Sequence, residues 1–193
     1  VGRAELIAEF IGQTAPKVKK VITEAKGGVL FIDEAYSLTR ADEDKKDFGQ
    51  EAIEVLLKEM SDGSGDIAIV VAGYPAEMQT FINSNPGLKS RFKQYFHFDD
   101  YLPEELMEIS KVALQKEETT LHADAEKILK QYITEQYRNR DDTFGNARLV
   151  YGIIDEAKKQ MGLRLLKSGN LASLSNEELS TITPADLLAI FRA

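Results

Sequence analysis

The 193-residue sequence contains no cysteine and only two histidines. Without cysteine the chain cannot form disulfides or thiolate metal sites, and His97 and His122 are too far apart to indicate a zinc centre. No apolar run approaches the ~20 residues that a membrane-spanning helix needs. Segment 1–10, VGRAELIAEF, has the pattern of neither a signal peptide nor a transit peptide. We therefore expect a cytoplasmic protein without a membrane partner.

Basic residues are also comparatively few. Lysine and arginine number 24 against 32 aspartates and glutamates, which gives a net charge of −8. This charge repels a phosphate backbone, and no local basic patch offsets it, so we expect no nucleic-acid partner. The hydrophobic content of 43% is enough for the core of one globular domain with a smaller companion.

Helix and strand patterns alternate in the first half of the chain, which favours an α/β fold with a parallel sheet. Apolar spacing predicts one helix from Thr14, its expected N-cap, to about residue 26 and a second from about 48 to 63. Short apolar or aromatic runs predict buried strands at 29–32 and 67–72 and a third strand at 95–98. A polar loop is expected at 40–47, and a short helix around residue 80.

From Pro103 onward the pattern is helical only. Periodic apolar positions predict helices around 106–113, 128–133 and 149–161, and the sequence Thr183-Pro184-Ala185-Asp186 is typical of the start of a last helix. The polar segment 168–181, SGNLASLSNEELST, is typical of a loop. We therefore expect an α/β part over residues 1–101 and an all-helical part over 102–193.

Two adjacent carboxylates, Asp33 and Glu34, follow the apolar run Val29–Ile32 directly. A parallel strand that is buried on both faces cannot keep a carboxylate inside, so both acids are expected at its carboxyl end, where open α/β sheets bind ligands. In a nucleotide hydrolase such a pair has two roles: the Asp holds Mg²⁺ and the Glu orients the attacking water. A solvated acidic turn remains the alternative interpretation of these residues.

Six motifs, in order along the chain, support the catalytic interpretation. They are EFIGQTAPKVKKVI, GGVLFIDEAYSL, DFGQEAIEVLLKEM, IVVAGYPAEM, SNPGLKSRF and FGNARLVYGIIDEA. Together they closely resemble the AAA+ ATPases of the CbbX/CfxQ type, a group that includes red-type Rubisco activase and proteins similar to stage V sporulation protein K. The resemblance covers about residues 1–165 and implies a parallel-sheet ATPase core followed by a helical lid.

The resemblance implies a role for several charged residues. Asp33 and Glu34 resemble the Walker B acids. Arg91, in LKSRF, resembles the arginine finger that completes a neighbouring subunit's site, and an ordinary surface arginine is the alternative. Arg148, in GNAR, resembles the sensor 2 arginine of the lid, which touches the nucleotide, and a salt bridge at a helix start is the alternative.

Uncharged residues receive roles from the same resemblance. Segment Phe10-Ile11-Gly12 resembles the pore loop that grips a client polypeptide in the central channel of a ring, and Phe10 as a core residue is the alternative. At the sensor 1 position AAA+ proteins often have Asn or Thr, whereas this chain has Gly73-Tyr74-Pro75. The Tyr74 hydroxyl is therefore the candidate there.

The phosphate-binding loop of the family is missing from the sequence. Its pattern requires lysine directly after glycine, and none of the 13 glycines here is followed by lysine. We therefore expect a fragment that lacks the first strand and the phosphate loop and is inactive as an ATPase by itself. The complete protein is expected to bind ATP and Mg²⁺ in a homo-oligomeric, hexameric ring and to remodel a client protein. A ring subunit or adaptor that has lost ATP binding is the alternative.

The family's usual strand order adds an expectation about the sheet. The missing first strand is central in that order, between the strands predicted at 67–72 and 95–98. We therefore expect these two strands not to pair directly with each other. Several clients, namely Rubisco, a sporulation factor and a secretion factor, are compatible with the motifs.

Overall fold

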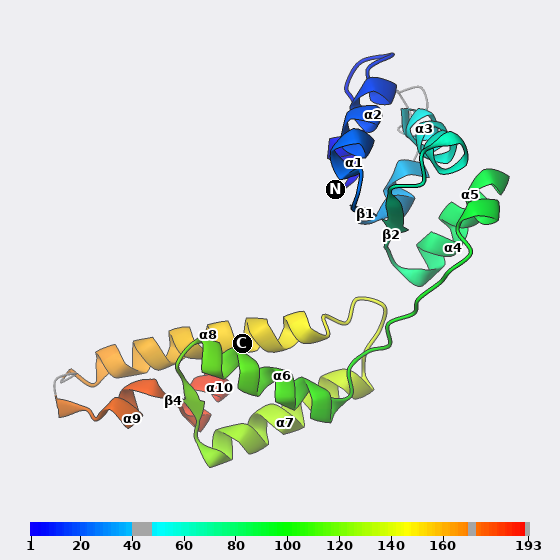
Figure 1. Cartoon of the computed structure of the whole chain (residues 1–193). Helices are drawn as coiled ribbons and strands as arrows, with labels where there is room; N and C mark the ends of the chain where they lie inside the picture. The colour runs from blue at the N-terminus through cyan, green and yellow to red at the C-terminus, as the bar shows by residue number, and fades with distance from the viewer. Residues whose placement is uncertain (40–47, 170–172, 192–193) are drawn as a thin grey trace. The chain divides into compact units, whose positions relative to one another are not determined.

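A computed structural model describes residues 1–39, 48–169 and 173–191, so the polar loop expected at 40–47 lies outside the described residues. The chain divides into two compact units, residues 1–96 and 97–193, and each is described by itself (Figure 1). Within the described residues, no helix is long and apolar enough to cross a membrane.

The first unit alternates helices with two strands, as the sequence pattern predicts. Its elements are α1 (Arg3–Leu6), α2 (Thr14–Ala25), β1 (Val29–Ile32), the 3₁₀ helix η1 (Ala35–Thr39), α3 (Phe48–Asp62), β2 (Ala68–Val71), α4 (Pro75–Asn83) and α5 (Pro86–Arg91). Strands β1 and β2 pair in parallel, with Val29 opposite Ala68 and Ile32 opposite Val71. The other edge of β1 is bonded to Val1, whose amino group donates to Phe31 O at 2.8 Å and whose carbonyl accepts from Asp33 N at 2.9 Å.

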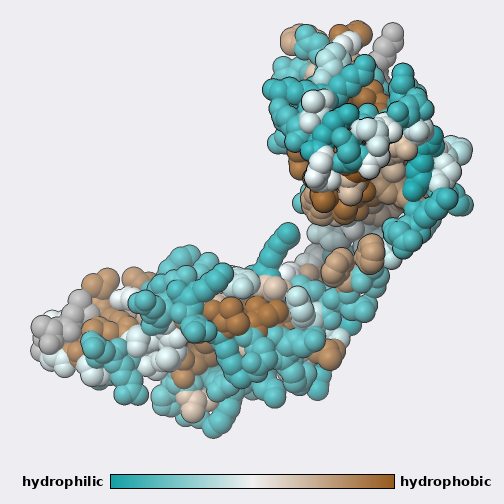
Figure 2. Space-filling view, in the orientation of Figure 1, coloured by the Kyte–Doolittle hydropathy of each residue, from teal (hydrophilic) through white to brown (hydrophobic). Residues whose placement is uncertain are grey.

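Only one face of this sheet is buried, so the expectation that β1 is covered on both faces is wrong. Leu30 and Ile32 are buried in a core with residues of the surrounding helices. On the opposite face Val29 is 62% exposed and Phe31 48% exposed, next to the half-exposed Val70 of β2. The described helices cover one side of the sheet, and the other remains an apolar surface. Figure 2 shows hydrophobic residues at the surface of this unit.

The third predicted strand, Tyr95–Phe98, does not form. Tyr95, Phe96 and Phe98 are 66%, 82% and 90% exposed, and their backbone has no regular structure. A strand needs a neighbour for its backbone groups, and the only strand paired with β2 among the described residues is β1. Because this strand does not form, the expectation about its pairing with β2 stays a prediction.

The start of α2 also differs from the sequence prediction. Gln13, and not Thr14, is the N-cap residue, and its side chain makes no capping hydrogen bond. The hydroxyl of the buried Thr14 instead accepts a hydrogen bond from Ala8 N at 3.3 Å. The Ala15 N–H, which has no acceptor within its own helix, donates to Glu51 Oε1 of α3 at 3.3 Å. A neighbouring helix therefore supplies the cap that the local sequence does not.

The second unit is mainly helical. Its elements are α6 (Pro103–Lys116), β3 (Thr120–Leu121), α7 (Ala123–Arg138), α8 (Ala147–Lys167), α9 (Asn176–Ser180), β4 (Thr181–Ile182) and α10 (Pro184–Phe191). The four long helices surround a separate core that includes Leu106, Leu129, Ile154 and Leu187. The all-helical expectation misses the short parallel pair β3–β4, and the loop expected at 168–181 contains α9. Two-residue strands carry too little alternation to be detected in sequence.

Candidate functional site

The candidate acids lie where β1 ends. Asp33 and Glu34 are both exposed, and the Asp33 carboxylate accepts a hydrogen bond from Glu34 N at 3.0 Å. Glu34 has a φ of 47°, a left-handed conformation that few non-glycine residues adopt. The chain then returns to β2, because Ala35 N donates to Ala72 O at 3.0 Å. This sharp turn leaves two carboxylates in solvent at the carboxyl end of a parallel sheet.

The end of β2 lies beside that turn. Ala72 N donates to Ile32 O at 2.9 Å, which extends the β1–β2 pairing by one bond. Gly73 is required by close packing, since an added Cβ would lie 2.7 Å from the Tyr36 ring. The next residue, Tyr74, is 51% exposed and precedes α4. The structure therefore brings Asp33, Glu34 and Tyr74 to the same edge of the sheet.

These carboxylates fit one kind of metal site. In the parts of the chain that the structure describes, no three His, Cys, Asp or Glu side chains gather as ligands. Mg²⁺ in nucleotide enzymes commonly takes one or two carboxylates, with waters and substrate phosphates completing its octahedron. The exposed pair Asp33 and Glu34 fits a Mg²⁺ ion whose other ligands are waters and phosphates. The pair does not fit a site in which protein side chains supply every ligand.

Arg91 is the last residue of α5, a helix capped by Asn85 through the Gly87 N–H at 2.7 Å. Its guanidinium donates from Nε to Ser61 Oγ at 3.0 Å and from Nη1 to Gly87 O at 3.2 Å. No carboxylate forms an ion pair with it among the described residues. The arginine is therefore oriented by neutral groups, and no described carboxylate compensates its charge. The contact with Ser61, 30 residues away, has no signal in the sequence.

Arg148 lies in the second unit, in the first turn of α8. Its side chain is exposed, and within the described ranges it makes no hydrogen bond or ion pair. The salt bridge considered as the alternative interpretation is therefore not found among the residues that the structure describes. A positively charged side chain at this position is open to an anionic ligand.

The segment Phe10-Ile11-Gly12 connects α1 to α2. Phe10 is 65% exposed and Ile11 78% exposed, so the interpretation of Phe10 as a core residue is wrong. Gly12 has a φ of 79°, which glycine adopts at little cost. Gln13 N donates to Phe10 O at 3.3 Å and closes a tight turn. Two large apolar side chains are thus presented to solvent on one loop.

Comparison with known proteins gives matches along nearly the whole chain. Residues 1–100 match the ATPase family associated with various cellular activities (AAA), and residues 102–192 match the AAA lid domain. A CfxQ homolog from Guillardia theta is 43% identical over 97% of this chain and 63% of its own length. The chloroplastic ribulose bisphosphate carboxylase/oxygenase activase from Cyanidioschyzon merolae gives the same three values. The chain therefore spans less than two thirds of these relatives.

The fold has solved counterparts as well. The crystal structure of the FIGL-1 AAA domain aligns with a TM-score of 0.65 over 100% of this chain and 60% of that chain, at 16% identity. At such identity the likeness concerns the fold alone. The predicted resemblance to CbbX/CfxQ proteins and the predicted AAA core with a helical lid are both confirmed.

Proposed function

This chain belongs to the AAA ATPase family, and from that premise we propose that it is part of a ring-forming ATPase that uses MgATP hydrolysis to remodel a client protein. In this proposal residues 1–101 belong to the α/β ATPase part and residues 102–193 form the lid. The relatives extend beyond the matched region, and the segment that this chain lacks would supply the phosphate-binding loop. ATP turnover is thus assigned to the complete protein and not to the 193 residues alone.

The observation that carries the proposal is the turn Asp33–Glu34 at the carboxyl end of β1. An exposed Asp33 would hold Mg²⁺, and that ion would neutralise charge on the nucleotide phosphates. Glu34, turned by its left-handed backbone, would orient the water that attacks the terminal phosphorus. Tyr74, at the same sheet edge, would contribute its hydroxyl to the phosphate side of the site.

Two arginines would complete the site. Arg91 has no ion pair with a carboxylate among the described residues and is held by Ser61 and Gly87, which suits a finger that offers its charge to a neighbouring subunit. Arg148 is exposed without a partner for its side chain among the described residues, which suits contact with the nucleotide from the lid. The Arg91 assignment requires a ring in which subunits share sites, and a hexamer is our proposal for it.

The client would be a protein, gripped by the exposed loop Phe10-Ile11-Gly12. One relative is named as a Rubisco activase, and that name does not decide the client of this chain. A cytoplasmic location stays a prediction, since the name of that relative places it in the chloroplast. Substitution Phe10→Ala in the complete protein should keep basal ATP hydrolysis and abolish its stimulation by the client. Equal stimulation in both proteins would exclude the gripping role.

The central test compares ATP binding and turnover in the complete protein and in the Glu34→Gln variant. Glutamine keeps the shape of the side chain and removes its charge, so ATP should bind with unchanged affinity while turnover is lost. A matched control is Glu77→Gln on the exposed face of α4, which should hydrolyse ATP normally. The 193-residue chain should show no turnover. A complete protein that neither binds nor hydrolyses ATP would instead favour the structural or adaptor ring subunit.

A further inference from the structure

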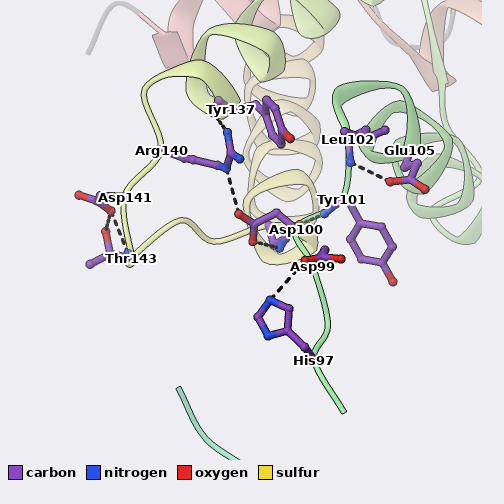
Figure 3. A network of polar contacts seen from close by, with 11 residues as sticks. His97, Asp99, Asp100, Tyr101, Leu102, Glu105, Tyr137, Arg140, Asp141 and Thr143 are labelled. Carbon is purple, nitrogen blue, oxygen red and sulfur yellow. Dashed lines mark hydrogen bonds and ion pairs between the residues drawn. The ribbon is translucent and has the colours of Figure 1, made fainter. Parts of the chain in front are cut away.

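The first residues of the second unit are bound to the loop that precedes α8 (Figure 3). The Asp100 carboxylate accepts hydrogen bonds from Arg140 Nε at 3.0 Å and from Asn146 Nδ2 at 2.7 Å. Asn146 Oδ1 in turn accepts a hydrogen bond from Tyr101 N at 3.1 Å. Asn146 therefore binds Asp100 through its amide nitrogen and Tyr101 through its amide oxygen.

Arg140 gives Asp100 a fixed partner. Its Nη1 donates to Tyr137 O at 2.8 Å, and its guanidinium lies over the Tyr137 ring at 3.8 Å from the centroid. Tyr137 also packs edge-on against Phe144, with centroids 6.3 Å apart. The end of α7 and the loop after it are thus tied together around the arginine. Cation–π and charge-assisted contacts of this kind restrict a side chain that would otherwise be mobile.

The side-chain hydrogen bonds of Asn146 stabilise an unusual backbone conformation at this residue. Its φ and ψ are 52° and −126°, a combination that glycine adopts readily and other residues do not. Arg148 N donates to Gly145 O at 2.9 Å, so residues 145–148 form a turn of the type II′ class with Asn146 at its first central position. Strained backbone of this kind persists when surrounding contacts hold it. The turn ends at Arg148.

We propose that Asp100 is a positioning residue for Arg148: by holding Asn146, it fixes the turn from which α8 starts and hence the place of the arginine. The inference rests on the proposed function, in which Arg148 contacts the nucleotide. Asp100 is distinguished from its neighbour Asp99 by its contacts. Among the described residues the Asp99 carboxylate pairs with His97 alone, at 3.3 Å, and has no contact with the turn.

The test is the affinity of the complete protein for MgADP, which needs no hydrolysis. Asp100→Ala should weaken binding about 3–10-fold, the effect of losing about one net hydrogen bond. Arg148→Ala should weaken it at least as much, and the double variant should bind no more weakly than Arg148→Ala alone. Asp99→Ala, the matched control, should bind normally. Asp100→Asn keeps an acceptor for Asn146 and should fall between Asp100→Ala and the wild type.

The outcomes separate this inference from the proposed function. Additive losses in the double variant, or an Asp100→Ala protein that behaves as Asp99→Ala does, would overturn the positioning role while Arg148 keeps its own. If Arg148→Ala binds MgADP normally, the nucleotide contact itself is wrong and the positioning role falls with it.

A second measurement needs no nucleotide. In the 193-residue chain, Asn146→Gly relieves the backbone strain but removes both side-chain bonds. Hydrogen exchange at the amides of Arg148 and Leu149 should accelerate in Asn146→Gly and in Asp100→Ala, and it should not change in Asp99→Ala. Unchanged exchange in both of the first two variants would show that backbone geometry alone holds the turn, and would overturn the inference.

Discussion

Replacing Asp186 by alanine removes the acceptor at the centre of a buried polar cluster in the second unit. Asp186 is 2% exposed, and its carboxylate accepts from Thr183 N and Thr183 Oγ1, both at 2.8 Å. Arg164 Nε donates to it at 2.9 Å, and Arg164 Nη2 also donates to Thr181 O at 3.0 Å. The cluster joins α8, β4 and the start of α10, so its loss should loosen all three.

The expected cost follows from the burial of the two partners. Removing one member of a buried ion pair typically costs ~3–5 kcal/mol. The Arg164 side chain is 34% exposed, so water can resolvate part of its charge. We therefore expect Asp186→Ala to cost about 3 kcal/mol, at the lower end of that range. Asp186→Asn keeps an acceptor for Thr183 and should cost less than Asp186→Ala, but it loses the charge and puts an amide NH₂ group where the oxygen facing Arg164 stood.

Hydrogen exchange of the intact chain measures this cost, since amides of α8 and α10 report on the second unit alone. A loss of about 3 kcal/mol corresponds to exchange about a hundred-fold faster at their most protected amides. Asp155→Ala is the matched control, because Asp155 is exposed on α8 and has no side-chain partner among the described residues. If Asp186→Ala accelerates exchange no more than this control does, the buried cluster contributes nothing and the reasoning is refuted.

Other predictions concern the site and pH. Asp33→Asn should raise the Mg²⁺ concentration that the complete protein needs for half-maximal ATP turnover, unlike Glu34→Gln, which removes turnover at any Mg²⁺ level. Arg91→Ala should bind ATP but lose ~10³-fold or more in turnover. Mixing these subunits with Glu34→Gln subunits should restore part of the activity, and no recovery despite subunit exchange would rule out a shared site. The Ser175 backbone N–H and hydroxyl hold the pKa of Glu178 below its ordinary 4.5. This capping contribution to stability should be complete above pH 4.5 and decline as pH falls through the lowered pKa, and an NMR titration of the carboxyl checks it.

Much of the fold follows from short-range patterns in the sequence. The apolar spacing of α2 and α3 gives both helices within a residue or two of their observed ends, because helix formation depends on neighbours three and four positions away. The candidate acids were predictable for a related reason. The run Val29–Ile32 is apolar throughout and Asp33 and Glu34 follow it directly, so the sequence places both acids at the end of the strand, although only one face of that strand is buried.

The features that the sequence did not predict depend on contacts between segments that lie far apart along the chain. The run Val29–Ile32 has the same composition whether one face of a strand is covered or both, and only the arrangement of helices leaves Phe31 half exposed. Tyr95–Phe98 has the side chains of a strand, but a strand forms only when another backbone lies beside it.

In the candidate site, too, the sequence predicts the residues but not the polar contacts that orient them. The identities of Arg91 and Arg148 could be proposed from motifs, whereas the Ser61 hydroxyl beside Arg91 comes from 30 residues away and Asp100 meets Asn146 across 46 residues. Hydrogen bonds between distant segments leave no periodic trace in a sequence. The sequence by itself determined which chemical groups this protein has and which helices and strands carry them. Only tertiary packing decided which neighbouring residues hold those groups in place, because long-range contacts form when whole elements come together.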